Sequence, residues 1–402
     1  MTDAKSTNIG AGKWDFDWAI APLPPQDFFR DYYEKSHLVI RREEADYYDS
    51  LLNLADIDSA VTSLGLRVNE LNMVRDGTGV PAADFAYANG AVDPVRVFAE
   101  VASGATLILQ GLHRRLPQLA AYCRSLEAEF SANLQTNIYM TPAGAQGFKT
   151  HYDTHDVIVL QAFGSKEWRI YDTPTELPMR QQSFDPEGFE PGPVRDTFTL
   201  GPGDMAYIPR GLVHDARSTD EMSLHITTGV LARSWTDLFL EAVAAHALKT
   251  PAMRQTLPPG YANDGYHGAD VQDRFADLLA GFMAGAAPQE AMSNLAADFQ
   301  SQRRPVVPGQ LLQIAGVDAL GPRSMVGARP ALIYKLDAGP EGQITLACHG
   351  NDITFPADIE AALRFALSTP QFMITELPGG LDEDSKLVLI RRLIREGLAL
   401  AL

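Results

Sequence analysis

Two stretches of the chain carry side chains whose types and spacing suit metal chemistry. In the first, His151 and Asp153 stand two residues apart, just before a β-branched apolar run. If this segment is a strand, residues i and i+2 project from one face, so the imidazole and the carboxylate can reach one point. They are two of the three ligands of a 2-His-1-carboxylate facial triad, which leaves open positions on a non-haem Fe(II) ion.

The second stretch supplies a candidate third ligand, His214. Gly203, Pro209, Gly211 and His214 follow the spacing G-x5-P-x-G-x2-H. This pattern indicates a strand, a Pro/Gly turn and a histidine at the start of the next strand. A His-x-Asp pair alone is usually a surface or capping pair, so it is the second stretch that favours a metal site.

Taken together, the two stretches resemble the two signatures of the cupin superfamily, in the form used by the JmjC-type 2-oxoglutarate oxygenases. The similarity is greatest to the ribosomal oxygenases of bacteria and eukaryotes. It extends to flanking segments at 137–147, Gln161, Gly164 and Lys166–Trp168. The resemblance implies an Fe(II) ion bound by His151, Asp153 and His214, with 2-oxoglutarate and O2 as cosubstrates.

The resemblance also assigns residues to 2-oxoglutarate. Lys166 falls where the family places the lysine that pairs with the distal carboxylate, and a surface β-turn lysine is the alternative. Asn137 and Tyr139 are i and i+2 of one expected strand and resemble the polar pair of the cosubstrate pocket. Thr227 would add a hydroxyl, although an ordinary strand threonine is an almost equal interpretation.

Three further residues are weaker candidates for the site. His155 is the runner-up ligand, because it would share the face of Asp153 in a regular strand. Asp156 would point to the opposite face. His225 shares a face with Thr227 and either orients a ligand or packs in the core.

Composition limits the class of protein. A length of 402 residues and 46% hydrophobic content suggest two or three domains with buried cores. Residues 1–8 contain no apolar segment of the signal-peptide type, and no run of about 18 uncharged apolar residues occurs, so we expect neither secretion nor a membrane span. Cys123 and Cys348 have no CxxC partner and are expected to be reduced thiols of a cytoplasmic protein.

The net charge of −18 limits the kinds of partner that the protein is expected to bind. It argues against nucleic-acid binding, which needs clustered Lys and Arg. It is compatible with a basic protein or peptide partner, and equally with an acidic surface that only keeps the protein in solution.

From about residue 134 the sequence consists of short candidate strands separated by Gly and Pro turns. The strands are expected at 135–141, 155–163, 167–172, 195–200, 204–208 and 223–231. The predicted fold class is therefore mainly β with α, with a double-stranded β-helix (cupin or jelly-roll) catalytic domain over residues 1–235. The long connection 173–194 is expected to shape access to the site. Trp14, Phe16 and Trp18 alternate, which fits an edge strand or a partly ordered arm.

Two further regions follow the expected catalytic domain. Residues 236–305 are expected to be helical, and by resemblance they pair with a second copy in a homodimer. Residues 306–402 combine helices with strands, at 331–335 and 344–348, as in a small winged-helix-like domain. From residue 330 onward, ten acidic residues outnumber six basic ones, the wrong sign for a surface that binds DNA phosphates.

The sequence therefore favours an Fe(II)- and 2-oxoglutarate-dependent oxygenase. By resemblance it hydroxylates an arginine or histidine side chain of a ribosomal or other protein or peptide, and demethylation is less favoured. Two alternatives stay open. One is an oxygenase that acts on a small molecule or natural-product peptide, and the other is a non-catalytic cupin whose C-terminal region acts as a regulator or adaptor.

Overall fold

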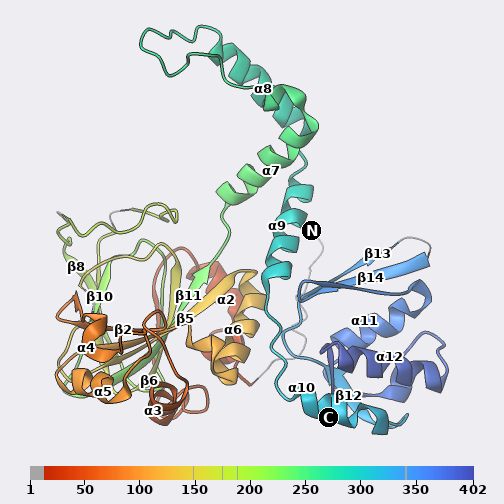
Figure 1. Cartoon of the computed structure of the whole chain (residues 1–402), viewed down its shortest axis with the longest axis horizontal. Coiled ribbons are helices and arrows are strands. Elements are labelled where there is room, and N and C mark those ends of the chain that lie inside the picture. Colours follow the sequence, from red (N-terminus) through yellow and green to blue (C-terminus); the bar gives the residue numbers. More distant parts are fainter. Residues whose placement is uncertain (1–12, 148, 174, 188, 340–341) are drawn as a thin grey trace.

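The computed structural model describes residues 13–402 except 148, 174, 188 and 340–341. Figure 1 shows a β-rich part formed by the first half of the chain, an arm of long helices, and a smaller α/β part at the C-terminal end. Of the edge strand or partly ordered arm predicted over residues 1–20, residues 1–12 lie outside the described residues.

Two antiparallel sheets form the β-rich part. The larger has the strand order β1-β9-β6-β11-β5-β4-β2-β3, and the smaller has the order β10-β7-β8. The strands are β1 (Leu38–Ile40), β2 (Leu71–Arg75), β3 (Thr78–Gly79), β4 (Thr106–Gln110), β5 (Asn133–Thr141), β6 (Asp156–Phe163), β7 (Lys166–Tyr171), β8 (Val194–Leu200), β9 (Met205–Ile208), β10 (His214–Ser218) and β11 (Ser223–Leu231). The strands predicted from residue 134 onward are confirmed, including the one that begins at His214.

Side chains on the two faces of the larger sheet enter two different cores. Strand residues alternate between faces, so Val157 and Val159 of β6 pack with Trp168 of the smaller sheet, whereas Ile158 and Leu160 join a larger core. Helices contribute to that larger core. They are α1 (Phe16–Ile20), α2 (Pro25–Asp31), α3 (Leu54–Ser63), α4 (Ala82–Phe85), α5 (Pro94–Ala102) and α6 (Pro117–Phe130). The result is a mixed α/β fold with a cupin-like β-sheet core.

Of the alternating aromatic residues near the N-terminus, Phe16 and Trp18 belong to a helix and not to an edge strand, and Trp14 lies in the turn before it. The carboxylate of Asp15 caps α1 by accepting a hydrogen bond from the Trp18 amide at 2.7 Å. Phe16 is fully buried, with ring centroids 5.3 Å from Phe28 and 5.0 Å from Phe130. The cap and the aromatic packing therefore outweigh the alternation.

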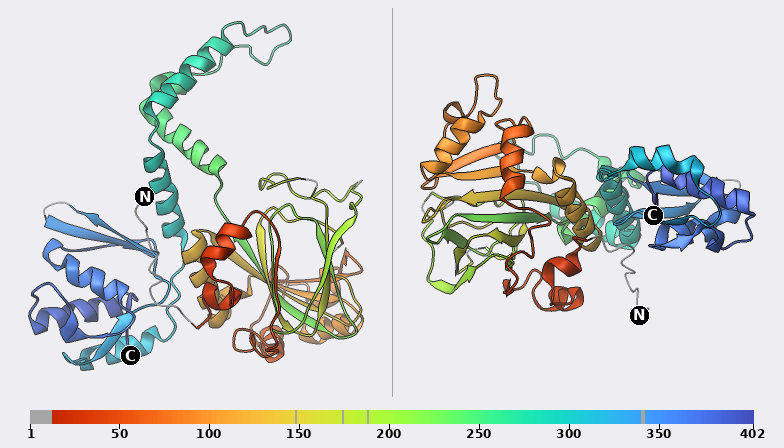
Figure 2. Two further views of the ribbon diagram at one scale, coloured as in Figure 1. Left: turned by 180° about the vertical axis from the view of Figure 1, so that it is seen from behind. Right: turned by 90° about the horizontal axis from the view of Figure 1, so that it is seen from below.

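Three long helices form the arm: α7 (Trp235–Lys249), α8 (Val271–Gly285) and α9 (Pro288–Gln302). Figures 1 and 2 show α8 standing well away from the other two parts of the molecule. Large apolar side chains are exposed along the arm: Trp235, Phe239, Leu240, Phe275 and Met283. None of the described helices is long and apolar enough to cross a membrane.

The C-terminal part has two three-stranded sheets, β16-β12-β17 and β13-β14-β15. Its elements are α10 (Gln310–Gly316), β12 (Met325–Ala328), β13 (Tyr334–Ala338), β14 (Gln343–Cys348), β15 (Asn351–Pro356), α11 (Glu360–Ser368), β16 (Phe372–Met373), α12 (Glu383–Arg395) and β17 (Ala399–Ala401). The strand predicted at 331–335 begins only at Tyr334, because Ala331 has a φ of 55°, which an extended strand does not allow. Strands β12, β15 and β17 are not among the predicted strands.

Candidate metal centre and cosubstrate pocket

The structure brings His151, Asp153 and His214 together. One ligand atom from each lies within 4.8 Å of the others. The Nε2 atom of His214 is 3.8 Å from Oδ2 of Asp153, and the two imidazole centroids are 4.7 Å apart. Among the described residues no other group of three or more His, Cys, Asp or Glu side chains has an arrangement that could hold a metal ion.

The backbone around these residues differs from the predicted strand. His151 forms an isolated bridge with His214, and the residues between it and Asp156 are not in a strand. The amide of each histidine donates to the carbonyl of the other, at 3.0 and 2.8 Å, and the Gly211 amide donates to the Asp153 carbonyl at 2.9 Å. Backbone hydrogen bonds between two distant segments, and not strand periodicity, therefore align the three side chains.

Both histidines are held in the tautomer that a metal requires. Nδ1 of His151 is 2.8 Å from the Lys149 carbonyl, and Nδ1 of His214 is 2.9 Å from the Leu212 carbonyl. A carbonyl can only accept, so Nδ1 carries the proton and Nε2 carries the lone pair. Metal-binding histidines are typically oriented by such a contact.

Burial also favours the neutral form of His214, which is the form that binds a metal. Its side chain is almost fully buried, and burial, with a smaller contribution from the neighbouring imidazole of His151, lowers the pKa of His214 to about 4. The ring is thus neutral at pH 7, as a metal ligand must be. The donor set of two imidazoles and one carboxylate fits Fe(II).

Two turns in the stretch that leads to His214, one before β9 and one after it, each depend on a glycine. Gly203 and Gly211 have φ values of 87° and 84°, in the left-handed region. A Cβ atom on Gly203 would lie 2.2 Å from the Glu44 carbonyl oxygen, and one on Gly211 would lie 2.3 Å from the Thr175 carbonyl oxygen. The spacing noted in the sequence therefore reflects positions where no side chain fits.

Lys166 is a buried residue, so its interpretation as a surface-turn lysine is wrong. It is 4% exposed, and Nζ donates to Oγ1 of Thr141 at 3.2 Å. Burial lowers the pKa of Lys166 to about 7. The lysine lines the same pocket as the three candidate ligands and has no ion pair with a described carboxylate, so the pocket is suited to an incoming anion.

Two neighbours of Lys166 in this pocket also lack partners. Both Nε1 of Trp168 and Nδ1 of His225 are buried without a hydrogen bond. Buried polar atoms are rarely left unpaired, so these two indicate a polar ligand. No role was predicted for Trp168, although its position two residues after Lys166 places both side chains on the same strand face.

The other predicted residues divide between the pocket and its surroundings. Tyr139 and Thr227 line the pocket, and the Tyr139 ring stacks on His225 at 5.0 Å. Asn137 is not among the lining residues and lies beside Tyr139 on β5. His155 is not grouped with the ligands, because the segment bends and its ring packs against Gly229 of β11.

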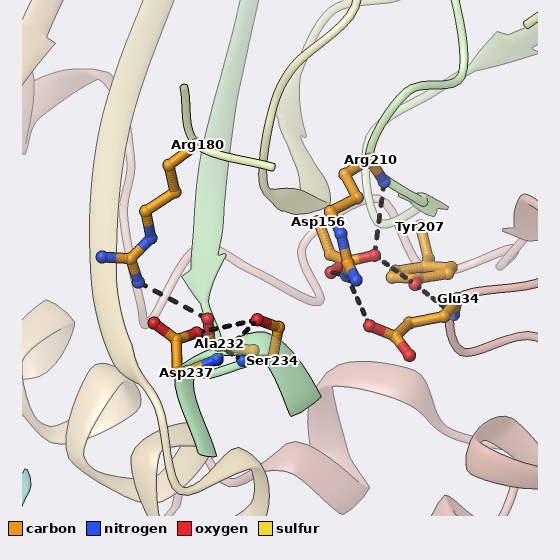
Figure 3. Close-up of polar contacts among 8 residues, drawn as sticks. All are labelled: Glu34, Asp156, Arg180, Tyr207, Arg210, Ala232, Ser234 and Asp237. Carbon is orange, nitrogen blue, oxygen red and sulfur yellow. Dashed lines mark hydrogen bonds and ion pairs between the residues drawn. The ribbon is translucent and has the colours of Figure 1, made fainter. Parts of the chain in front are cut away.

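Asp156 faces away from the metal cluster. It is fully buried and accepts hydrogen bonds from Tyr207 at 2.8 Å and from Nη1 of Arg210 at 3.0 Å. Figure 3 shows this network with Glu34, which pairs with Arg210. Asp156 thus supports the turn that carries Arg210 and is not a ligand.

The connection between β7 and β8 contacts one candidate ligand, His151, and the neighbouring residue Tyr152. The ring centroid of Phe184 lies 6.4 Å from that of His151 and 5.3 Å from that of Tyr152. The Tyr152 hydroxyl donates to the Gln182 carbonyl at 3.0 Å. This long loop therefore lies against the metal cluster, as a loop that shapes access would.

Comparison with known proteins adds a family context. Residues 112–238 match the family model described as JmjC domain. Ribosomal oxygenase 1 of Rattus norvegicus is 32% identical over 276 residues, covering 64% of this chain and 44% of that protein. Ribosomal oxygenase 2 of the same species is 31% identical over 285 residues, covering 66% and 58%. The chain thus spans about half the length of these relatives.

A solved structure is similar over most of the chain. YcfD, a ribosomal oxygenase from Escherichia coli, matches with a TM-score of 0.55 at 16% identity, covering 94% of this chain and 98% of that chain. The likeness shows a common fold that extends through the arm and the C-terminal part.

Proposed function

We propose that this chain, a JmjC-domain protein related to the ribosomal oxygenases, is an Fe(II)- and 2-oxoglutarate-dependent oxygenase that hydroxylates a side chain of a protein or peptide. The observation that carries the proposal is the convergence of His151, Asp153 and His214, with both imidazoles held in the metal-binding tautomer. An oxygenase of this kind needs three fixed protein ligands and open positions on the iron, and this arrangement of side chains would provide both.

His151, Asp153 and His214 would hold the iron. When bound, the metal supplies the activation of O2 that side chains cannot provide. The chain's own contribution is to hold two neutral imidazoles and one carboxylate on one side of the pocket, and to surround them with the buried residues Trp168 and His225. Structures of YcfD that contain cobalt with 2-oxoglutarate, and cobalt with succinic acid, support the assignment by fold.

The cosubstrate would occupy the pocket beside the metal cluster. Lys166 would pair with the distal carboxylate, and the unpartnered nitrogens of Trp168 and His225 lie where a polar ligand would satisfy them. Tyr139 and Thr227 would complete the wall, with Asn137 supporting Tyr139. The sequence resemblance suggests the roles of Lys166, Tyr139, Asn137 and Thr227, and the geometry of the pocket adds those of Trp168 and His225.

The substrate is proposed to be a basic protein or peptide, such as a ribosomal protein, with arginine or histidine as the target. The names of the relatives support a ribosomal substrate. The loop over the metal cluster adds a physical reason. It exposes four carboxylates without an ion pair to any described residue: Glu176, Asp185, Glu187 and Glu190. Unpaired carboxylates at the entrance would attract a cationic segment.

The division into parts and the assembly belong to the same proposal. Residues 1–235 would form the catalytic domain, residues 236–305 a helical dimerisation domain, and residues 306–402 a winged-helix-like domain. The exposed apolar side chains of α7 and α8 support a homodimer, because such surfaces usually mark an interface. We propose a cytoplasmic protein without a nucleic-acid or membrane partner.

The proposal can be tested in the host cell. Tryptic peptides from cells with and without this protein should differ in at least one basic peptide that gains the mass of one oxygen atom. The purified protein should release succinate from 2-oxoglutarate in the presence of Fe(II) and that peptide. Identical peptide masses, together with no succinate, would contradict the proposed activity and favour a binding protein.

A further inference from the structure

The loop over the metal cluster is attached on two sides. On the cluster side, Tyr152 holds the Gln182 carbonyl, and Thr175 and Pro178 pack against Gly211, three residues before His214. These contacts fix the start of the loop to the segments that carry the ligands. They do not connect the loop to the helical arm.

Arg180 makes the connection to the arm. Its Nη2 donates to the Leu231 carbonyl at 3.1 Å and to the Ala232 carbonyl at 3.4 Å. Figure 3 shows the second of these contacts. Leu231 is the last residue of β11 and Ala232 follows it, shortly before Ser234 and Asp237 cap α7. The guanidinium also acts on the cap: although burial works in the opposite direction, hydrogen bonds from Ser234 and the charges of Arg233 and Arg180 lower the pKa of Asp237.

Arg180 forms one wall of a cavity beside the metal cluster. The cavity has a volume of about 180 Å³ and is lined by loop residues 177–181, the residues that follow Asp153, and the first turn of α7. Its opposite wall contains Glu34, Asp156 and Arg210. Together with Tyr207 behind them, they form a network that has several hydrogen bonds and a fully buried carboxylate (Figure 3). That wall is held by many contacts. Among the described residues of the loop wall, by contrast, the hydrogen bonds to the end of β11 come from the exposed side chain of Arg180 alone.

Arg180 lies close in sequence to the loop residues that contact the metal cluster, so its contact with the end of β11 also affects their position. Gln182 and Phe184, which contact Tyr152 and His151, follow it by two and four residues. A loop segment this short transmits the location of one end to the other, because few backbone torsions separate them. Without the contact, the loop would keep its attachment at Gly211 but lose its attachment to the arm.

We infer that Arg180 is a positioning residue, which ties the loop over the metal cluster to the start of the helical arm and so holds that loop in the conformation that receives the substrate. The expected effect of Arg180 on substrate binding rests on the proposed function. Its expected effect on the position of the loop rests on the contacts alone. Arg180 does not touch the metal cluster, so it would act through Gln182 and Phe184.

Hydrogen–deuterium exchange of the full chain tests the structural consequence without requiring activity. In Arg180→Ala, amides of residues 176–187 should exchange at least about threefold faster than in the unmodified protein, because local opening becomes easier. Arg180→Lys should restore part of the protection, since an ammonium group can also donate to the two carbonyls. Arg195→Ala is the matched control, because Arg195 is an exposed arginine at the other end of the same connection, paired with Asp172.

Kinetics then test the consequence for the substrate. The KM for the substrate peptide should rise about three- to tenfold in Arg180→Ala, while kcat changes less than about twofold, as expected when binding geometry alone is lost. Iron content should be unchanged. Equal exchange rates in Arg180→Ala, Arg195→Ala and the unmodified protein would overturn the inference. Faster exchange in a protein without oxygenase activity would uphold the role of Arg180 and contradict the proposed function instead.

Discussion

At the metal cluster, the side chains His151, Asp153 and His214 are aligned by backbone hydrogen bonds, and the pocket around them is buried. On the helical arm, Phe239 is 60% exposed and Met283 is 69% exposed, although both are large and apolar. All three side chains of the metal cluster come from the same chain. The helical arm leaves apolar surface in water, which costs free energy until something covers it.

This difference indicates where each region obtains its stability. A substitution at the metal cluster should change chemistry with little effect on assembly, because the backbone contacts that shape the site remain. A substitution on the arm should change assembly first. The following predictions test this separation.

The largest effect is expected at Asp153. Asp153→Ala should abolish Fe(II) binding and succinate formation, because a three-ligand site has no ligand to spare. The fold should persist, since the hydrogen bond from Gly211 goes to the backbone carbonyl of residue 153. Metal content and thermal melting measure the two properties. Asp220→Ala, an exposed carboxylate after β10, is the control. Unchanged iron content in Asp153→Ala would remove this residue from the ligand set.

The next effect concerns the arm. Phe239→Asp should convert the expected homodimer to monomer at micromolar concentration. Lost burial of the ring and desolvation of the new carboxylate together cost at least about 3 kcal/mol, or more than a hundredfold in the dissociation constant. Light scattering gives the mass. Val95→Asp, at a residue that is 78% exposed on α5, should leave the dimer intact. A monomeric unmodified protein would contradict the role proposed for the arm.

A smaller effect is expected at Lys166. Lys166→Ala should raise the apparent KM for 2-oxoglutarate about tenfold to a hundredfold, because a charge-assisted contact of about 1.5–3 kcal/mol is lost. Initial rates at saturating peptide measure this. Glu167→Gln, on the exposed face of the same strand, is the control. If the KM does not move, another cation holds the carboxylate.

The pH dependence follows from the same lysine. Burial lowers the pKa of Lys166 to about 7, so above that pH the ligand-free protein loses the charge that the carboxylate needs. Binding must then take up a proton, and the affinity for 2-oxoglutarate should fall by up to about tenfold per pH unit above 7. Anaerobic calorimetry of the iron-loaded protein between about pH 6.5 and 8.5 measures it. In Lys166→Arg, which keeps its charge, the affinity should not follow pH in this way.

The smallest effect concerns the entrance loop. Turnover of a basic peptide should fall a few-fold as salt rises from about 0.05 to 0.5 M, because salt screens attraction between separated charges. The double substitution Asp185→Asn and Glu187→Gln, which removes both charges, should weaken this dependence on salt. A neutral peptide of equal length serves as the comparison. Turnover of the basic peptide that ignores salt would argue against an electrostatic role for the loop carboxylates.

Local sequence patterns determined much of the candidate site. The spacing of His151 and Asp153, and the G-x5-P-x-G-x2-H pattern before His214, predicted the three residues that the structure brings together. The strands that carry Lys166, Tyr139 and Thr227 were also predictable, because alternation and Gly/Pro turns are local signals.

Tertiary structure alone decided how those residues are held. The segment from His151 to His155 is not a strand, and its geometry comes from a backbone bridge between His151 and His214, 63 residues away in the numbering. Burial of Lys166, whose Ser-Lys-Glu context reads as a surface turn, results from packing between the two sheets. The contact of Arg180 with Leu231 joins segments 51 residues apart. Periodicity describes only neighbours along one element, so contacts between distant elements can be read only when the chain has folded.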